Sequence, residues 1–172
     1  MPTVRGHVPI RPHLLRYVQW RENLSMGEPL ILPGFTAISS ALDLILINKG
    51  GFLAAAESGR RKEVGLSACT AFMPYEVSGS RFSHNYIFVT DTAALAFNTF
   101  LNNLMNEDLL HRVAVGQSAG LYERDVIIDF LRDTTVDDFL DHEALKKAQW
   151  RLRRYRGYVA KRGRPVRGTV FK

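Results

Sequence analysis

The chain is poor in cysteine and in long apolar runs. Its 172 residues include one cysteine, Cys69, which excludes an intramolecular disulfide and a cysteine-cluster zinc site. The longest apolar stretch, Ala41 to Ile47, contains Asp43 and is far too short to cross a bilayer. The sequence after Met1 lacks the apolar core of a secretion signal. We therefore expect a cytoplasmic protein without a membrane partner.

Acidic residues are missing from the last part of the chain. From Lys146 to Lys172 there are eleven Lys and Arg and no Asp or Glu, whereas residues 1–145 contain the other twelve Lys and Arg and all seventeen Asp and Glu. The formal net charge of +6 is therefore +11 on this segment and −5 on the remainder. Such polarity favours a polyanionic partner, because each neutralised phosphate of a nucleic acid releases counterions. A tail that only keeps the protein soluble is the alternative interpretation.

The basic segment also contains aromatic rings that could stack on bases, namely Trp150, Tyr155 and Tyr158. Asp141 can cap a helix from His142 to about Tyr158, and Gly163, Pro165 and Gly168 then indicate a flexible arm. We expect DNA, and after it RNA, as the partner. The candidate nucleic-acid-binding residues are the cations of this helix and arm: Lys146, Lys147, Arg151, Arg153, Arg154, Arg156, Lys161, Arg162, Arg164 and Arg167.

Hydrophobic periodicity predicts an α+β fold, in which a short-stranded sheet packs with helices and precedes a helical unit and a basic tail. The expected strands are residues 3–10, 30–32 and 64–73, the last one bounded by Pro74. The expected helices are residues 12–21, 36–48 and 91–112, and the glycines between 116 and 120 break the last one. The predicted organisation is an α+β body (1–115), a hinge (116–120), a helical unit (121–158) and a flexible basic arm (159–172).

The helical unit has a helix-turn-helix pattern. A helix over residues 122–132 is followed by a very short helix that Thr134 and Thr135 cap, and then by the basic helix. A recognition helix of this kind lies in the major groove of DNA. The alternative is a hairpin in which acidic and basic helices form a salt-bridged surface.

The segment Gly116-Gln117-Ser118-Ala119-Gly120 matches the nucleophile elbow of α/β-hydrolases. Only His142 follows Ser118, and the parallel strands of that fold are not predicted, so a hinge explains the two glycines more simply. The five histidines are scattered without metal-ligand spacing, and no glycine-rich phosphate loop is present. We predict no catalytic residue, no metal and no cofactor.

Two ends of the chain resemble small accessory proteins from phages and integrative elements of the Bacteroidetes lineage. Those proteins begin with a short strand and R-P-x-L-x-x-Y-[IV], which residues 11–18 match, and they end in an aromatic-acidic helix, which residues 127–131 resemble. Their final helix reads L-K-K-x-x-x-R-x-R, as residues 145–153 do. The resemblance covers about a third of the chain. It implies an accessory protein of a mobile element that acts on DNA, and it brings no catalytic residue.

The sequence therefore predicts a DNA-binding accessory or regulatory protein, not an enzyme, that uses its basic helix and arm and could form a homo-oligomer. The alternative is a non-enzymatic phage structural or interaction protein whose basic tail contacts nucleic acid or an acidic partner.

Overall fold

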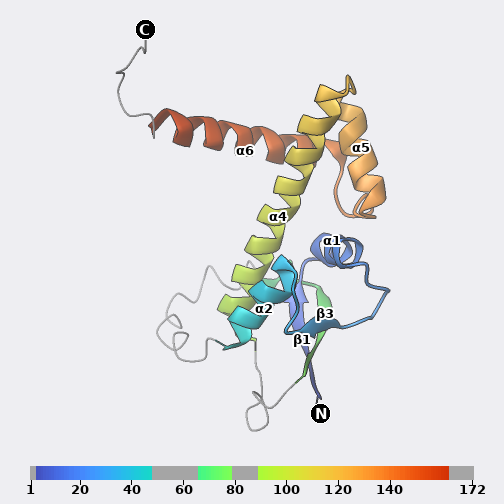
Figure 1. Cartoon of the computed structure of the whole chain (residues 1–172), viewed down its shortest axis with the longest axis vertical. Helices are drawn as coiled ribbons and strands as arrows, with labels where there is room; N and C mark the ends of the chain where they lie inside the picture. Colours follow the sequence, from blue (N-terminus) through green and yellow to red (C-terminus); the bar gives the residue numbers. More distant parts are fainter. Residues whose placement is uncertain (1–2, 48–65, 79–88, 163–172) are drawn as a thin grey trace.

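The computed structural model describes residues 3–47, 66–78 and 89–162, and within them the predicted α+β class is confirmed (Figure 1). Five helices and a three-stranded sheet are present in these residues. The elements are β1 (Thr3–Ile10), α1 (Pro12–Glu22), β2 (Leu30–Leu32), α2 (Ala37–Ile47), β3 (Ala71–Ser78), α4 (Asp91–Ser118), α5 (Glu123–Asp133) and α6 (His142–Arg162).

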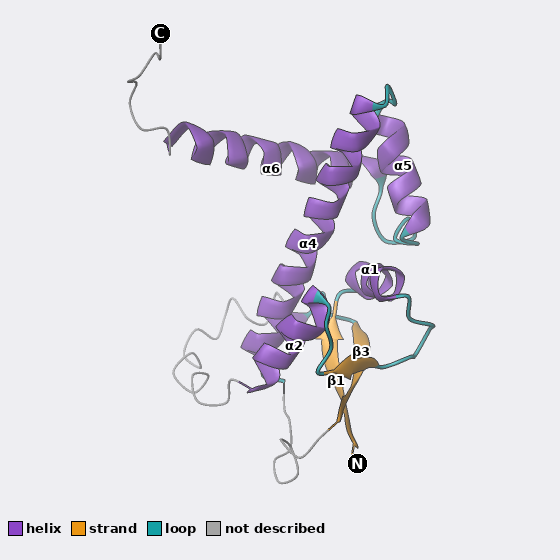
Figure 2. Cartoon of the chain, viewed as in Figure 1, coloured by secondary structure: helices purple, strands orange, loops and turns teal. Residues whose placement is uncertain are grey.

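The sheet has the order β1-β3-β2, with β1 antiparallel and β2 parallel to the central strand β3 (Figure 2). Side chains alternate along each strand, so that one face of the sheet is buried. The buried residues are Val8, Ile10, Leu30, Leu32, Met73, Tyr75 and Val77. The opposite face carries exposed Phe72 and Ile31. The helices therefore cover one side of the sheet.

The third strand lies further along the chain than predicted. Residues 66–70 form a turn, in which the Cys69 N–H donates to the Leu66 carbonyl at 2.8 Å, and β3 runs through Pro74 instead of ending there. On the β2 side of the sheet, pairing starts only with Leu30 beside Tyr75. Pro74 precedes that pairing, so its missing N–H removes no bond to β2. Of the predicted strand at 64–73, residues 71–73 belong to β3, residues 66–70 do not, and residues 64–65 lie outside the described residues.

The long helix α4 is the centre of the hydrophobic core (Figure 1). Its buried residues recur every three or four positions, as in an amphipathic helix, and include Ala94, Phe97, Leu101, Met105, Leu109 and Val113. Thr90 caps the helix by accepting the Ala93 N–H at 3.2 Å. The buried residues from Val8 to Leu145 belong to one continuous cluster. The division into a body and a helical unit stays a prediction.

Asn98, a buried residue of α4, fastens the junction between β1 and α1. Its side-chain amide donates to the carbonyl of Pro9 at 2.9 Å, and its Oδ1 accepts the Arg11 N–H at 2.9 Å. These bonds give two backbone groups at the junction a side-chain partner on α4. The strand and the first helix are thereby held at a fixed position against α4.

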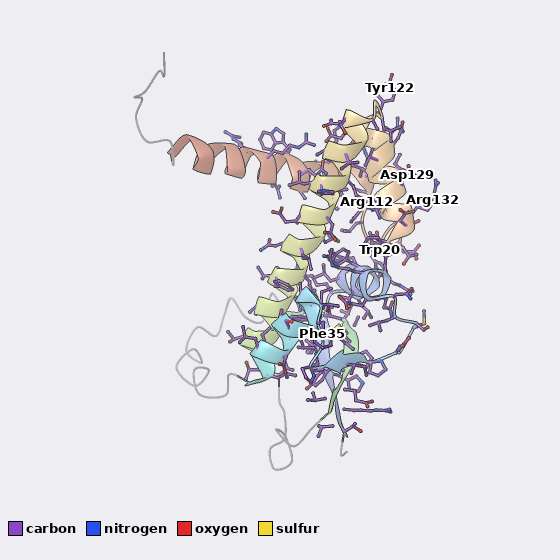
Figure 3. All side chains as sticks on the ribbon, viewed as in Figure 1. Trp20, Phe35, Arg112, Tyr122, Asp129 and Arg132 are labelled. Carbon is purple, nitrogen blue, oxygen red and sulfur yellow. The ribbon has the colours of Figure 1, made fainter. Side chains whose placement is uncertain are left out.

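A second junction joins α1, α4 and α5. The Arg112 guanidinium of α4 lies 5.0 Å from the Trp20 ring centroid and 5.4 Å from that of Phe130, and it pairs with Asp133 at 2.7 Å (Figure 3). Beside it, Tyr17 donates a hydrogen bond of 2.6 Å to Asp108. The rings of Trp20 and Phe130 meet edge to face, and the guanidinium near both adds cation–π attraction to the burial of apolar surface. The junction positions α5 against the body.

The helix α4 ends within the predicted break at 116–120, although it continues through Gly116 to Ser118 and so passes the predicted helix end at residue 112. A Cβ at Gly116 would lie 2.5 Å from Cγ2 of Val126 in α5, so glycine lets the two helices approach closely. The chain turns instead at Gly120, whose φ of 81° favours glycine.

The connection between α5 and α6 spans Thr134 to Asp141 and consists of turns, where we predicted a very short helix. It is longer than the three to four residues, roughly, of a helix-turn-helix connection. The helix α6 then crosses the end of α4 and extends away from the body (Figures 1 and 2). The helix-turn-helix unit therefore stays a prediction, whereas the two helices themselves are present.

Candidate nucleic-acid interface

The basic helix α6 begins where the sequence predicts. The Asp141 carboxylate accepts the Ala144 N–H at 2.6 Å, which is the expected N-terminal cap. The helix then runs to Arg162, four residues beyond the predicted end at Tyr158. Its side chains at positions 152 and 155–162 lie outside the described residues.

The inner side of α6 attaches the helix to the rest of the molecule. Leu145 is 2% exposed and belongs to the main core, and Gln149, one turn further on, is 1% exposed. Across 30 residues of sequence, the guanidinium of Arg153 pairs with Glu123 at the start of α5 at 3.3 Å. The Gln117 amide donates to the same carboxylate at 3.4 Å. These contacts join α6 to the adjoining ends of α4 and α5.

The outer side of α6 is a cationic face around one aromatic ring. Trp150 is 59% exposed, and the guanidinium carbon of Arg154 lies 5.1 Å from its ring centroid. Residues three and four positions apart are neighbours on a helix surface. All four such neighbours of this tryptophan are cations, namely Lys146, Lys147, Arg153 and Arg154. The exposed indole of Trp150 is thus flanked by four cationic side chains.

A groove of about 370 Å³ opens beside Trp150, between α6 and the start of α5. Its lining residues are Glu123, Glu143, Lys146, Lys147, Trp150 and Arg153. Its volume lies near the lower end of the range for ligand sites, about 300–1,000 Å³. The groove offers a ring face, several cations and two carboxylates.

The structure places five of the predicted site residues together on α6, and all five are exposed: Lys146, Lys147, Arg151, Arg153 and Arg154. Arg156, Lys161 and Arg162 belong to the same helix, but their side chains lie outside the described residues. Arg164 and Arg167 lie outside them altogether.

Two of the five exposed cations have acidic neighbours. Lys146 lies 3.9 Å from Glu143, and Arg153 pairs with Glu123. For Lys147 and Arg151, no ion pair is formed within the described part of the chain. Neither an ion pair nor a ring contact therefore holds these two side chains within the described residues.

The sequence reasoning missed the two carboxylates of the groove. Neither Glu143 nor Glu123 was among the predicted site residues, and Glu123 is 30 positions away from its partner Arg153. Helical spacing alone would have located Glu143, because it lies three and four residues before Lys146 and Lys147. No local pattern points to Glu123.

A second hollow, of about 480 Å³, lies between α4 and α5. Asp129 and Asp133 line it together with Arg112 and His111, and exposed Leu121 is at its rim. Figure 3 shows Asp129 and Arg132 on the outer side of α5 and Tyr122 at its beginning. Arg112 is already paired with Asp133, so this hollow has less free positive charge than the face of α6.

Ser118 is the last residue of α4, and its hydroxyl donates to the carbonyl of Val115 at 2.7 Å. A nucleophile elbow needs a strand before the serine, whereas a helix precedes it here. In the described residues, no three His, Cys, Asp or Glu side chains gather to hold a metal ion. None of the helices in the described ranges combines the length and apolar character that a membrane span needs.

Comparisons with protein families, curated proteins and solved structures found no match to this chain. The resemblance to accessory proteins of mobile elements therefore stays a prediction.

Proposed function

We propose that this protein binds nucleic acid, DNA before RNA, through the outer face of α6. One observation carries the proposal: five exposed cations lie together on a helix that extends away from the rest of the molecule (Figure 1). Cations on a projecting helix can approach a phosphate backbone.

The electrostatic balance supports a phosphate partner. The segment from Lys146 carries +11 and the remainder −5, so attraction of a polyanion is directed to one end of the molecule. Phosphate contacts supply affinity and position, and they require no particular base sequence. The function that fits is a sequence-tolerant accessory or regulatory binder of nucleic acid.

The test is a fluorescence anisotropy titration of the full chain against labelled duplex DNA at several salt concentrations. A plot of the logarithm of the binding constant against the logarithm of the salt concentration should be a falling line. Each neutralised phosphate should contribute about −0.9 to its slope. Lys147→Ala and Arg151→Ala should each weaken binding and reduce the slope by roughly one contact. A response that does not depend on salt would contradict the proposal.

Arg124→Ala is the matched control. Arg124 is an exposed cation of α5 that lies outside the α6 face, and its loss changes the net charge by the same amount. Its removal should leave affinity nearly unchanged. If Arg124→Ala and Lys147→Ala lowered the affinity equally, binding would depend on the total charge of the protein and not on this face of α6.

A further inference from the structure

The groove beside Trp150 is chemically different from a simple phosphate site. A phosphate would gain from Lys146 and Lys147, but it would be repelled by the carboxylates of Glu123 and Glu143 in the same groove. A nucleobase is neutral, and its N–H groups can donate to carboxylate oxygens. The mixture of charges therefore fits a base within the groove and phosphates on the cations around it.

The exposed ring of Trp150 supplies the surface on which a base can stack. It stays 59% exposed in the free protein although burial of so large a ring is favourable. Arg154 lies over the ring at 5.1 Å, and Arg side chains themselves stack on planar groups. In a duplex both faces of each base are covered by its neighbours, whereas an unpaired base has free faces.

We propose that this groove receives an unpaired nucleobase stacked on Trp150, so that α6 prefers single-stranded to duplex nucleic acid. The inference rests on the proposed function and adds the strand state of the partner to it. The backbone phosphates on either side of the base lie on Lys147 and Arg151, which form no ion pair in the described residues. Stacking on tryptophan is tolerant of base identity, because every base has a π-face.

The experiment compares the full chain with Trp150→Leu and Trp150→Phe on four labelled probes. These are a DNA strand without self-complementarity, its duplex, an RNA strand of the same sequence, and heparin, a polyanion without bases. Trp150→Leu should weaken single-strand binding by roughly ten- to a hundred-fold, the loss expected for one stacked base. Trp150→Phe should restore most of the affinity, while duplex and heparin binding stay as in the parent protein.

A second readout comes from tryptophan fluorescence. In a Trp20→Phe background, Trp150 is the only tryptophan of the chain, and single strands should quench its emission more strongly than heparin at equal saturation. DNA and RNA strands should bind alike, because stacking does not read the sugar. A preference for the DNA strand or for the RNA strand would show which nucleic acid supplies the base, and the proposed base site would still hold.

Two failures can be told apart. Absence of binding to every probe at low salt would overturn the proposed function, and this inference with it. Equal affinity for duplex and single strand, together with a silent Trp150→Leu, would overturn the base site and leave the cationic face of α6 intact. A thermal melt of each variant checks that an effect on binding does not come from unfolding.

Discussion

At the scale of single residues, Gly116 shows how one missing side chain sets the distance between two helices. A Cβ there would lie 2.5 Å from Cγ2 of Val126, whose β-branched side chain is 8% exposed and stiff in a helix. Glycine inside a helix costs about 1 kcal/mol relative to alanine. The close contact between α4 and α5 is the physical reason why glycine is favoured here.

We predict that Gly116→Ala destabilises the protein although it improves helix propensity. Overpacking of a core costs roughly 1–3 kcal/mol, which exceeds the gain of about 1 kcal/mol in propensity. Urea unfolding of both single variants and of Gly116→Ala/Val126→Ala would measure the coupling between the two sites. Val126→Ala should be less costly in the Gly116→Ala background by about 0.5 kcal/mol or more. Additive losses would contradict the predicted contact.

His13 gives the folded protein a dependence on pH. Burial, and then the positive charge of Arg11, lower the pKa of His13 to about 4. In the unfolded chain the pKa of histidine is about 6.5, so the unfolded state binds a proton between these values and the folded state does not. Stability is therefore fully present above pH 6.5 or so and is lost as the pH falls toward about 4.

We predict that His13→Gln removes this part of the pH dependence. Between about pH 6.5 and 4, the free energy of unfolding of the parent should fall by up to about 2 kcal/mol more than that of the variant, with allowance for the solvent-exposed part of the ring. Urea unfolding at a series of pH values measures the difference. Carboxylates titrate in the same pH range in both proteins, so their contributions cancel in the difference between the two free energies of unfolding. Parallel curves would show that His13 is not buried in a neutral state.

At the scale of elements, α6 has a mixed inner side. Leu145 is a buried apolar contact, whereas the amide of Gln149 is buried and neither its Nε2 nor its Oε1 has a hydrogen-bond partner in the described residues. A buried polar group without a partner costs about 1–3 kcal/mol. Among the described side chains of α6, buried Leu145 and the Arg153–Glu123 pair therefore hold the helix, and the amide of Gln149 opposes them.

We predict that Leu145→Ala destabilises the protein and weakens nucleic-acid binding although every cation is kept. Truncation of a buried leucine costs about 2–5 kcal/mol, and the helix that positions the cations loses its anchor. Leu44→Ala, at a position that is 62% exposed, is the control for the loss of side-chain volume. A thermal melt and the salt titration check both effects. If Leu145→Ala were silent in both assays, the basic segment would be acting as an unanchored tail.

One helical turn further along α6, at Gln149, we predict a substitution that stabilises the protein. Gln149→Leu replaces an unbonded amide by an apolar group of similar size, so it should stabilise the protein by about 1 kcal/mol. Chemical denaturation of the parent and the variant measures the shift. A loss of stability in Gln149→Leu would show that the amide has a bonding partner, for instance a water molecule.

At the scale of the whole molecule, the core is continuous from β1 to the start of α6. Val8 and Leu145 belong to the same buried cluster, and Arg112 joins α1, α4 and α5 in one junction. Contacts of this kind couple the elements, since the loss of one exposes apolar surface on the others. The body and the base of the cationic helix therefore share one core.

We predict that residues of the body and of α5 unfold together. Trp20 lies in the junction of α1, α4 and α5, so its fluorescence in a Trp150→Phe background reports on that junction. The fluorescence transition in urea should coincide with the loss of far-ultraviolet circular dichroism. Two separate transitions would instead support a helical unit that folds apart from residues 1–115.

The sequence by itself determined the types of most elements and the polarity of the charge. β1, α1, α2, α5 and α6 lie within a few residues of their predicted bounds. Their hydrophobic repeats and the cap at Asp141 are local signals, because they depend on neighbours within a few positions. The cations of α6 could also be found from the sequence, because Lys and Arg are concentrated after residue 145 and acidic residues are absent there.

Only the tertiary structure decided the features that join distant residues. Pro74 lies inside β3 because β2 pairs only with the residues after it, and Gly116 stays helical because Val126 packs against it. The groove beside Trp150 exists because Glu123 meets Arg153 from another helix. Such contacts form between segments that the fold brings together, and the free energy of packing there outweighs the local preference of a proline or glycine to end an element.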